Sequence, residues 1–64
     1  MADPHIADRL ARLRHDLSNP LSAILAETQL LLLNQDKYDE ETVSTLKQIE
    51  VLARRMREIL LSLG

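Results

Sequence analysis

His15 and Asp16 stand next to each other in the sequence, and their side chains suit nucleophilic chemistry assisted by an acid. Near neutral pH an imidazole is partly neutral and offers a nucleophilic nitrogen. An adjacent carboxylate can hold the proton of the other ring nitrogen and so fix the tautomer. Asn19 follows four residues later, so on a helix its amide lies one turn away, where it can position a water molecule or a phosphoryl oxygen. The plainer alternative is a solvated histidine on the outside of a helix.

The direction of His15 follows from the apolar residues around it. Each residue turns a helix by about 100°, so His15 points about 160° away from both Leu13 and Leu17. We therefore expect His15 to face away from the core, with Asn19 on the same outer side. Arg12 and Ser22 continue this polar stripe.

Pro20 breaks a local rule close to this histidine. Because proline has no backbone N–H, the Asp16 carbonyl loses its helical partner, at a cost of about 3 kcal/mol in a helix interior. The apolar spacing is irregular at the same place, since Leu13, Leu17 and Leu21 follow one another in two steps of four. We expect the helix to bend near Pro20. A broken rule beside a reactive group indicates function.

Two long helices must carry these residues. Asp3 and Pro4 indicate a helix start, since aspartate caps free amides and proline is tolerated at the first helical position. Apolar residues then recur in steps of three and four, which predicts a first helix over about 4–33. Leu25 and Leu32 flank this stripe, and we expect them to widen the core rather than to form an exposed docking surface. The stripe consists of Ile6, Leu10, Leu13, Leu17, Leu21, Ile24, Thr28 and Leu31.

A polar turn and a second helix follow. Residues 34–39 have no apolar period, and Asp39 can cap a second helix over about 40–63. Glu40 and Glu41 would lie near the positive end of its dipole. Three arginines lie toward the carboxyl end, where the dipole favours cations: Arg54, Arg55 and Arg57. The second apolar stripe consists of Leu46, Ile49, Ala53, Met56, Leu60 and Leu63, widened by Leu52 and Ile59.

Composition limits the fold and the partners. The chain of 64 residues has a net charge of −2 and no cysteine, so we expect neither nucleic acid as a partner nor a thiolate site. Two histidines, His5 and His15, do not make a metal site. The longest apolar run, 30–33, is far too short to span a membrane, and we expect a cytoplasmic protein. Two helices cannot enclose stripes this wide, so the prediction is an all-α, antiparallel helical hairpin over 1–64, a single domain that homodimerises into a four-helix bundle.

The string His15-Asp16-Leu17-Ser18-Asn19-Pro20-Leu21 resembles the H-box of sensor histidine kinases. The family pattern is histidine, an acid, two residues, asparagine or threonine, then proline and leucine, and every position matches. The chain is therefore similar to a dimerisation and histidine phosphotransfer domain of the HisKA type, over nearly its whole length. The H-box is specific, whereas the second helix is generic.

The resemblance implies a role for each matching residue. His15 would be the phosphoacceptor that attacks the γ-phosphate of ATP, and Asp16 the acid that orients or activates it. Asn19 would position water in a phosphatase reaction, and Pro20 would set the helix bend. The phosphoryl group would then pass to an aspartate in the receiver domain of a response regulator.

The resemblance also implies a missing part. ATP and Mg²⁺ would be bound by a separate ATP-binding domain, so this chain, with no cofactor site of its own, should be inactive alone. We expect a domain excised from a larger kinase, itself a phosphotransferase. The alternatives are a stand-alone histidine phosphotransfer protein and a non-catalytic helical dimerisation module.

Overall fold

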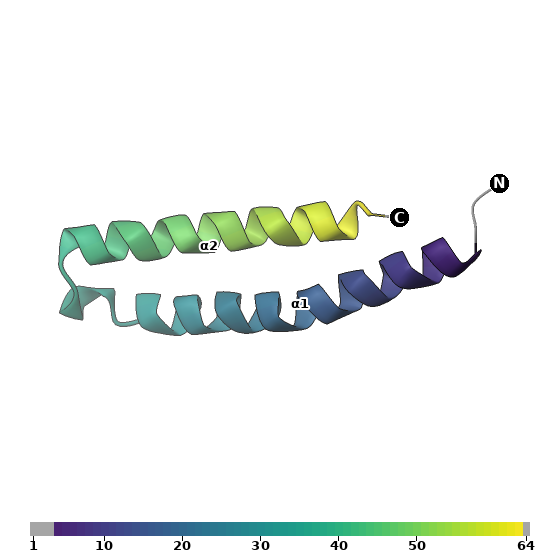
Figure 1. The fold of residues 1–64 in the computed structure, drawn as a ribbon. Coiled ribbons are helices and arrows are strands. Elements are labelled where there is room, and N and C mark those ends of the chain that lie inside the picture. Colours follow the sequence, from purple (N-terminus) through teal and green to yellow (C-terminus); the bar gives the residue numbers. More distant parts are fainter. Residues whose placement is uncertain (1–3, 64) are drawn as a thin grey trace.

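Two long antiparallel helices lie side by side in the computed structural model, which describes residues 4–63 (Figure 1). Helix α1 spans Pro4–Leu32, and helix α2 spans Glu40–Leu61. The described N- and C-terminal ends lie at the same end of a rod whose Cα atoms extend over 53 × 14 × 11 Å. The predicted all-α hairpin is confirmed. α1 ends one residue, and α2 two residues, before the ends that the apolar pattern predicts.

The turn contains a short element that the sequence pattern did not predict. A 3-10 helix, η1, spans Gln35–Lys37, and it reverses the chain between the two long helices. The N–H groups of Lys37 and Tyr38 donate to the carbonyls of Asn34 and Gln35 at 3.0 and 3.1 Å. The polar run that reads as a simple turn is thus tied by its own backbone hydrogen bonds.

Helix α2 starts as predicted. The backbone N–H of Thr42 donates to Oδ1 of Asp39 at 2.8 Å, so Asp39 is the N-cap, and Glu40 and Glu41 occupy the first turn. The cap predicted at Asp3 lies outside the described residues. Arg54, Arg55 and Arg57 lie toward the carboxyl end of α2 as predicted, but all three precede its last turn, where the dipole effect is concentrated.

The core between the helices is small. Its buried apolar side chains are Leu21, Leu25, Ala53 and Leu60, with Leu63 packed against them. Thr28 is also buried, and its hydroxyl donates to the Ile24 carbonyl at 2.7 Å, so burial leaves no unsatisfied hydroxyl. Leu25 belongs to the core as expected.

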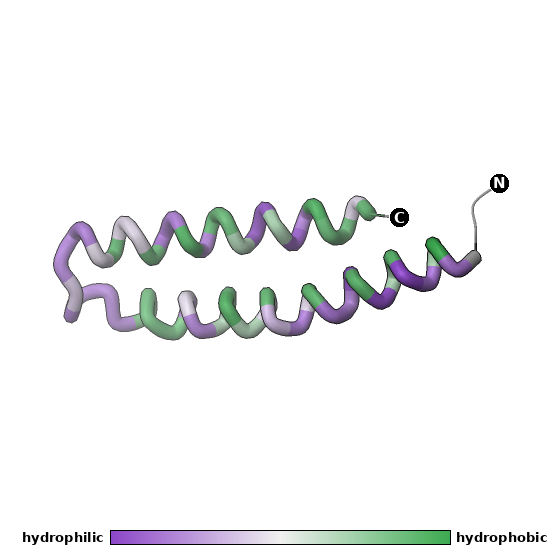
Figure 2. The backbone as a smooth tube through the Cα atoms, viewed as in Figure 1, coloured by the Kyte–Doolittle hydropathy of each residue, from purple (hydrophilic) through white to green (hydrophobic). Residues whose placement is uncertain are grey.

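The apolar stripes of the sequence divide into two rows in the structure. Leu21 and Leu25 face α2, whereas Leu17 and Ile24 remain 44% and 49% exposed. Hydrophobic residues recur along both helices, as the green segments of the tube show (Figure 2). Within the described residues, more large apolar side chains are exposed than buried. The exposed row comprises Leu10, Leu13, Leu17, Ile24 and Leu31 on α1, and Ile49, Leu52, Met56 and Ile59 on α2.

Helix α1 continues through Pro20 without a break. It changes direction near its middle, in the blue part of the ribbon, so that its two halves do not share one axis (Figure 1). Proline removes an N–H and crowds the preceding turn, which is one of the few physical causes of a helix bend.

Candidate functional site

His15 and Asp16 face each other on the surface of α1. His15 Nδ1 lies 3.7 Å from Asp16 Oδ1, which is an ion-pair distance but too long for a hydrogen bond. The two side chains are 75% and 67% exposed. A pair this exposed adds little to stability, because water screens it. Its geometry matters for chemistry instead: with a carboxylate beside Nδ1, Nε2 is the ring nitrogen that stays open to attack an electrophile.

The outward direction predicted for His15 agrees with its exposure. Asn19 and Pro20 are also exposed, one turn further along α1, while Leu21 is buried at 4% exposure and fixes this turn against α2. The four predicted site residues therefore occupy neighbouring positions on one exposed stretch of a helix anchored from beneath. His15 lines none of the grooves described below for residues 4–63 and is mostly exposed, so a reacting partner would approach it from solvent.

The other histidine and the nearby serines differ from this group. His5 is exposed near the start of α1, ten residues before His15. Ser18 is half-buried on the side of α1 that faces α2, and Ser22 is exposed. Among the side-chain hydrogen bonds of the described residues, neither serine hydroxyl pairs with a side chain that could act as a base.

Arg14 is a residue near the site that the sequence pattern missed. Its Nη1 donates to the carbonyl oxygen of Leu63 at 3.1 Å, across 49 positions of the chain. Arg14 is half-buried and lies seven residues before Leu21, in the row that faces α2. This spacing could have identified Arg14 from the sequence, because it places a charged residue in line with the buried residues of α1.

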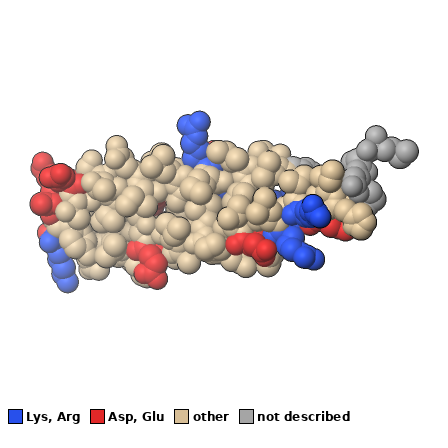
Figure 3. Space-filling model, viewed as in Figure 1, with Lys and Arg blue, Asp and Glu red and all other residues tan. Residues whose placement is uncertain are grey.

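An apolar groove of about 380 Å³ runs between the helices beside Pro20. The face shown in Figure 3 is largely free of charged side chains across both helices, and the charges gather at its edges and ends. Such a surface is typical of a protein–protein contact. The groove is lined by Leu17, Pro20, Leu21, Ile24, Met56, Ile59 and Leu60.

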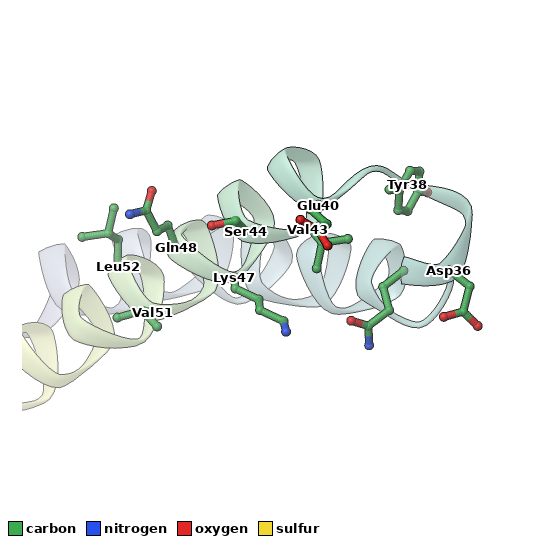
Figure 4. Close-up of a pocket in the computed structure, with 10 residues that line it drawn as sticks. Asp36, Tyr38, Glu40, Val43, Ser44, Lys47, Gln48, Val51 and Leu52 are labelled. Carbon is green, nitrogen blue, oxygen red and sulfur yellow. The ribbon is translucent and has the colours of Figure 1, made fainter.

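A larger groove of about 860 Å³ lies beside the turn (Figure 4). Charged side chains of both signs, Asp36, Glu40 and Lys47, border it together with Tyr38. It runs from η1 along α2 as far as Leu52 and shares no residue with the histidine site.

The described residues 4–63 contain no group of three or more His, Cys, Asp or Glu side chains placed to hold a metal ion. Neither of their long helices has both the length and the apolar content that crossing a bilayer requires.

Comparison with protein-family models gives a match. The family model of the His Kinase A (phospho-acceptor) domain matches residues 6–63, which include the whole His15–Leu21 stretch and both helices. The searches of curated proteins and of solved structures found no match.

Proposed function

The chain belongs to the His Kinase A (phospho-acceptor) domain family, and on that premise we propose that it is the dimerisation and phosphoacceptor domain of a cytoplasmic sensor histidine kinase, with His15 as the phosphorylated residue. Domains of this family are parts of histidine kinases, which are phosphotransferases. The observation that carries the proposal is an exposed imidazole with a carboxylate beside Nδ1, in the stretch that the family model covers.

The proposed reaction begins with ATP held by a separate ATP-binding domain together with Mg²⁺. Nε2 of His15 attacks the γ-phosphorus, a P–N bond forms, and the bond to the β–γ bridging oxygen breaks, so that ADP leaves. The imidazole gains positive charge as the bond forms. Asp16 stabilises this charge because its carboxylate lies 3.7 Å from Nδ1, and solvent then takes the Nδ1 proton. The result is a phosphohistidine.

The second half of the proposal is transfer to a receiver domain. A receiver aspartate attacks the phosphorus, the P–N bond breaks, and His15 recovers its proton. In the proposed phosphatase reaction, the receiver's phospho-aspartate is hydrolysed. Asn19, exposed one turn from His15, positions the attacking water molecule against it. Pro20 allows α1 to bend, so that partners of different shape can reach the same histidine.

Dimerisation completes the core in this proposal. A hairpin whose described residues bury only four apolar side chains leaves a row of leucines and isoleucines exposed next to them. Leu10, Leu17, Ile24 and Leu31 recur every seven residues, which is the repeat of helices packed in a bundle. Fully burying one such side chain contributes about 1.5–3 kcal/mol. A second copy of the chain, placed over the apolar groove, would form a four-helix bundle.

The test is chemical phosphorylation of the 64-residue chain with phosphoramidate. This small donor transfers its phosphoryl group to imidazole with loss of ammonia and needs no ATP-binding domain. Mass spectrometry and phosphorus NMR should detect one acid-labile phosphohistidine, and peptide mapping should place it at His15.

Two variants sharpen the test. His15→Gln should remove the labelling, whereas His5→Gln, which alters the other histidine of α1, should retain it. Equal labelling of His15→Gln and the parent would show that His15 is not the acceptor. A chain that dimerises but takes no phosphoryl group would instead be a non-catalytic dimerisation module.

A further inference from the structure

Arg14 joins the histidine-bearing turn of α1 to the end of α2. Its guanidinium reaches the Leu63 carbonyl, one position beyond the C-cap Ser62, through a partly buried hydrogen bond of 3.1 Å. The last turn of α2 has no basic residue of its own, so the cation that meets its negative end comes from the other helix. Leu63 packs against the hairpin core, which keeps this carbonyl in place.

The hydrogen bond from Arg14 lies on the N-terminal side of Pro20, where it can hold this part of α1 against the end of α2. The buried core residues of α1, Leu21 and Leu25, lie on the C-terminal side of Pro20, and His15 lies on the other side. Pro20 weakens the helix between the two parts. On the His15 side, the bond from Arg14 is therefore a polar tie that crosses from α1 to α2 beyond the weak point.

Rotation of this turn is also restricted. Arg14 and His15 are consecutive, so they project about 100° apart from the same turn of the helix. When the Arg14 side chain is held toward Leu63, the imidazole lies on the outer side of the helix, and a large rotation of this turn would carry the guanidinium away from its acceptor.

We propose that Arg14 is a positioning residue that clamps the turn bearing His15 to the C-terminal end of α2 and thereby limits bending at Pro20. The clamp is a property of the hairpin. Its importance for phosphoryl transfer rests on the proposed function, because His15 is the group it would position.

Spin-label distances in the full chain test the clamp. The sequence has no cysteine, so introduced cysteines are unique labelling sites, and dilution with unlabelled chain suppresses distances between copies. One pair, Ala11→Cys with Glu58→Cys, joins α1 before Pro20 to α2. A second pair, Gln29→Cys with Gln48→Cys, lies on the turn side of Pro20. All four native residues are exposed.

The informative variant is Arg14→Met, which keeps an apolar stem and removes the donor. It should broaden and shift the distance distribution of the first pair and leave the second unchanged. Arg12→Met, which alters an exposed arginine two residues away, should change neither. If Arg14→Met loses helix content by circular dichroism, Arg14→Lys, which keeps the charge on a shorter stem, should give an intermediate broadening. Identical distributions for the parent and the Arg14 variants, or equal broadening of both pairs, would overturn the clamp.

Phosphoramidate labelling separates this inference from the proposed function. The small donor reaches His15 in either arrangement, so Arg14→Met should be labelled at the parent's rate. A lower rate would overturn a purely positioning role, since Arg14 would then act on the donor. Failure of the parent to be labelled at His15 would count against the proposed function, while the distance measurements would still decide the clamp.

Discussion

Leu17 and Leu21 lie one turn apart on α1, yet Leu21 is 4% exposed and Leu17 is 44% exposed. Leu21 packs toward α2 within the hairpin, whereas Leu17 lies on the adjoining face, at the edge of the apolar groove. This one-turn difference separates the residues that fold the hairpin from those that we propose join two hairpins.

The first prediction concerns this exposed face. Leu17→Asp should shift the chain from dimer to monomer, because a carboxylate would be buried without a partner at the proposed interface. Sedimentation equilibrium measures the change. Leu30→Asp is the matched control. Leu30 is 57% exposed, but it is not one of the apolar residues of α1 that recur every seven positions with Leu17. Equal dissociation by both substitutions, or by neither, would show that the Leu17 face is not the interface.

The second prediction concerns the carboxylate beside Nδ1. Asp16→Asn should slow phosphoramidate labelling of His15 about 100-fold, the low end of what a positioned acid or base contributes. The physical reason is the loss of negative charge 3.7 Å from the ring nitrogen that becomes positive. Asp8→Asn, which alters another exposed acid of α1, should label at the parent's rate. A normal rate for Asp16→Asn would remove Asp16 from the mechanism.

The third prediction concerns Pro20. Pro20→Ala restores the N–H that the Asp16 carbonyl lacks, so the free energy of unfolding should rise by up to about 3 kcal/mol. Urea denaturation followed by circular dichroism measures it. Pro4→Ala is the control, because Pro4 begins α1 at a position where proline costs little, and its effect should be small. A loss of stability in Pro20→Ala would mean that the ring's packing in the apolar groove outweighs the missing hydrogen bond.

The fourth prediction concerns pH and the start of α2. The Thr42 hydroxyl, followed by the Thr42 backbone N–H, lowers the pKa of Asp39 below its usual value. A lowered folded-state pKa means that the cap stabilises the fold at a pH above the unfolded-state pKa, and that this stabilisation is lost as the pH falls through the folded-state pKa. The helix content and thermal midpoint should therefore fall in acid. Asp39→Asn, which keeps an acceptor oxygen without the charge, should reduce this acid-dependent loss; an unchanged acid profile would show that other groups cause it.

Periodicity predicted the hairpin, the Asp39 cap and the outward direction of His15, because each depends on residues close together in the sequence. The same periodicity placed Leu17 and Leu21 in one apolar stripe. Steps of three and four define a broad apolar face of the helix, but they do not show which part of that face packs against α2. The exposures separate the two rows.

The contact of Arg14 with Leu63 could not be predicted from residues close together in the sequence. The two residues are 49 positions apart, so their meeting depends on the length of the turn and on how the helices align. The 3-10 helix η1 contributes to that alignment, and polar residues such as Gln35 and Asp36 gave no periodic sign of it. The roles of Asp16, Asn19 and Pro20 stay predictions that the experiments above decide.

The thinness of the rod has a thermodynamic consequence. The Cα atoms of the hairpin extend only 14 × 11 Å across its long axis, so two helices cannot shield their interior, and no described side chain has an exposure below 2%. If a second copy supplies the missing cover, folding and association become a single equilibrium. The melting temperature would then rise with the amount of protein in solution, and the abundance of the chain in the cell would itself set how much of it is folded.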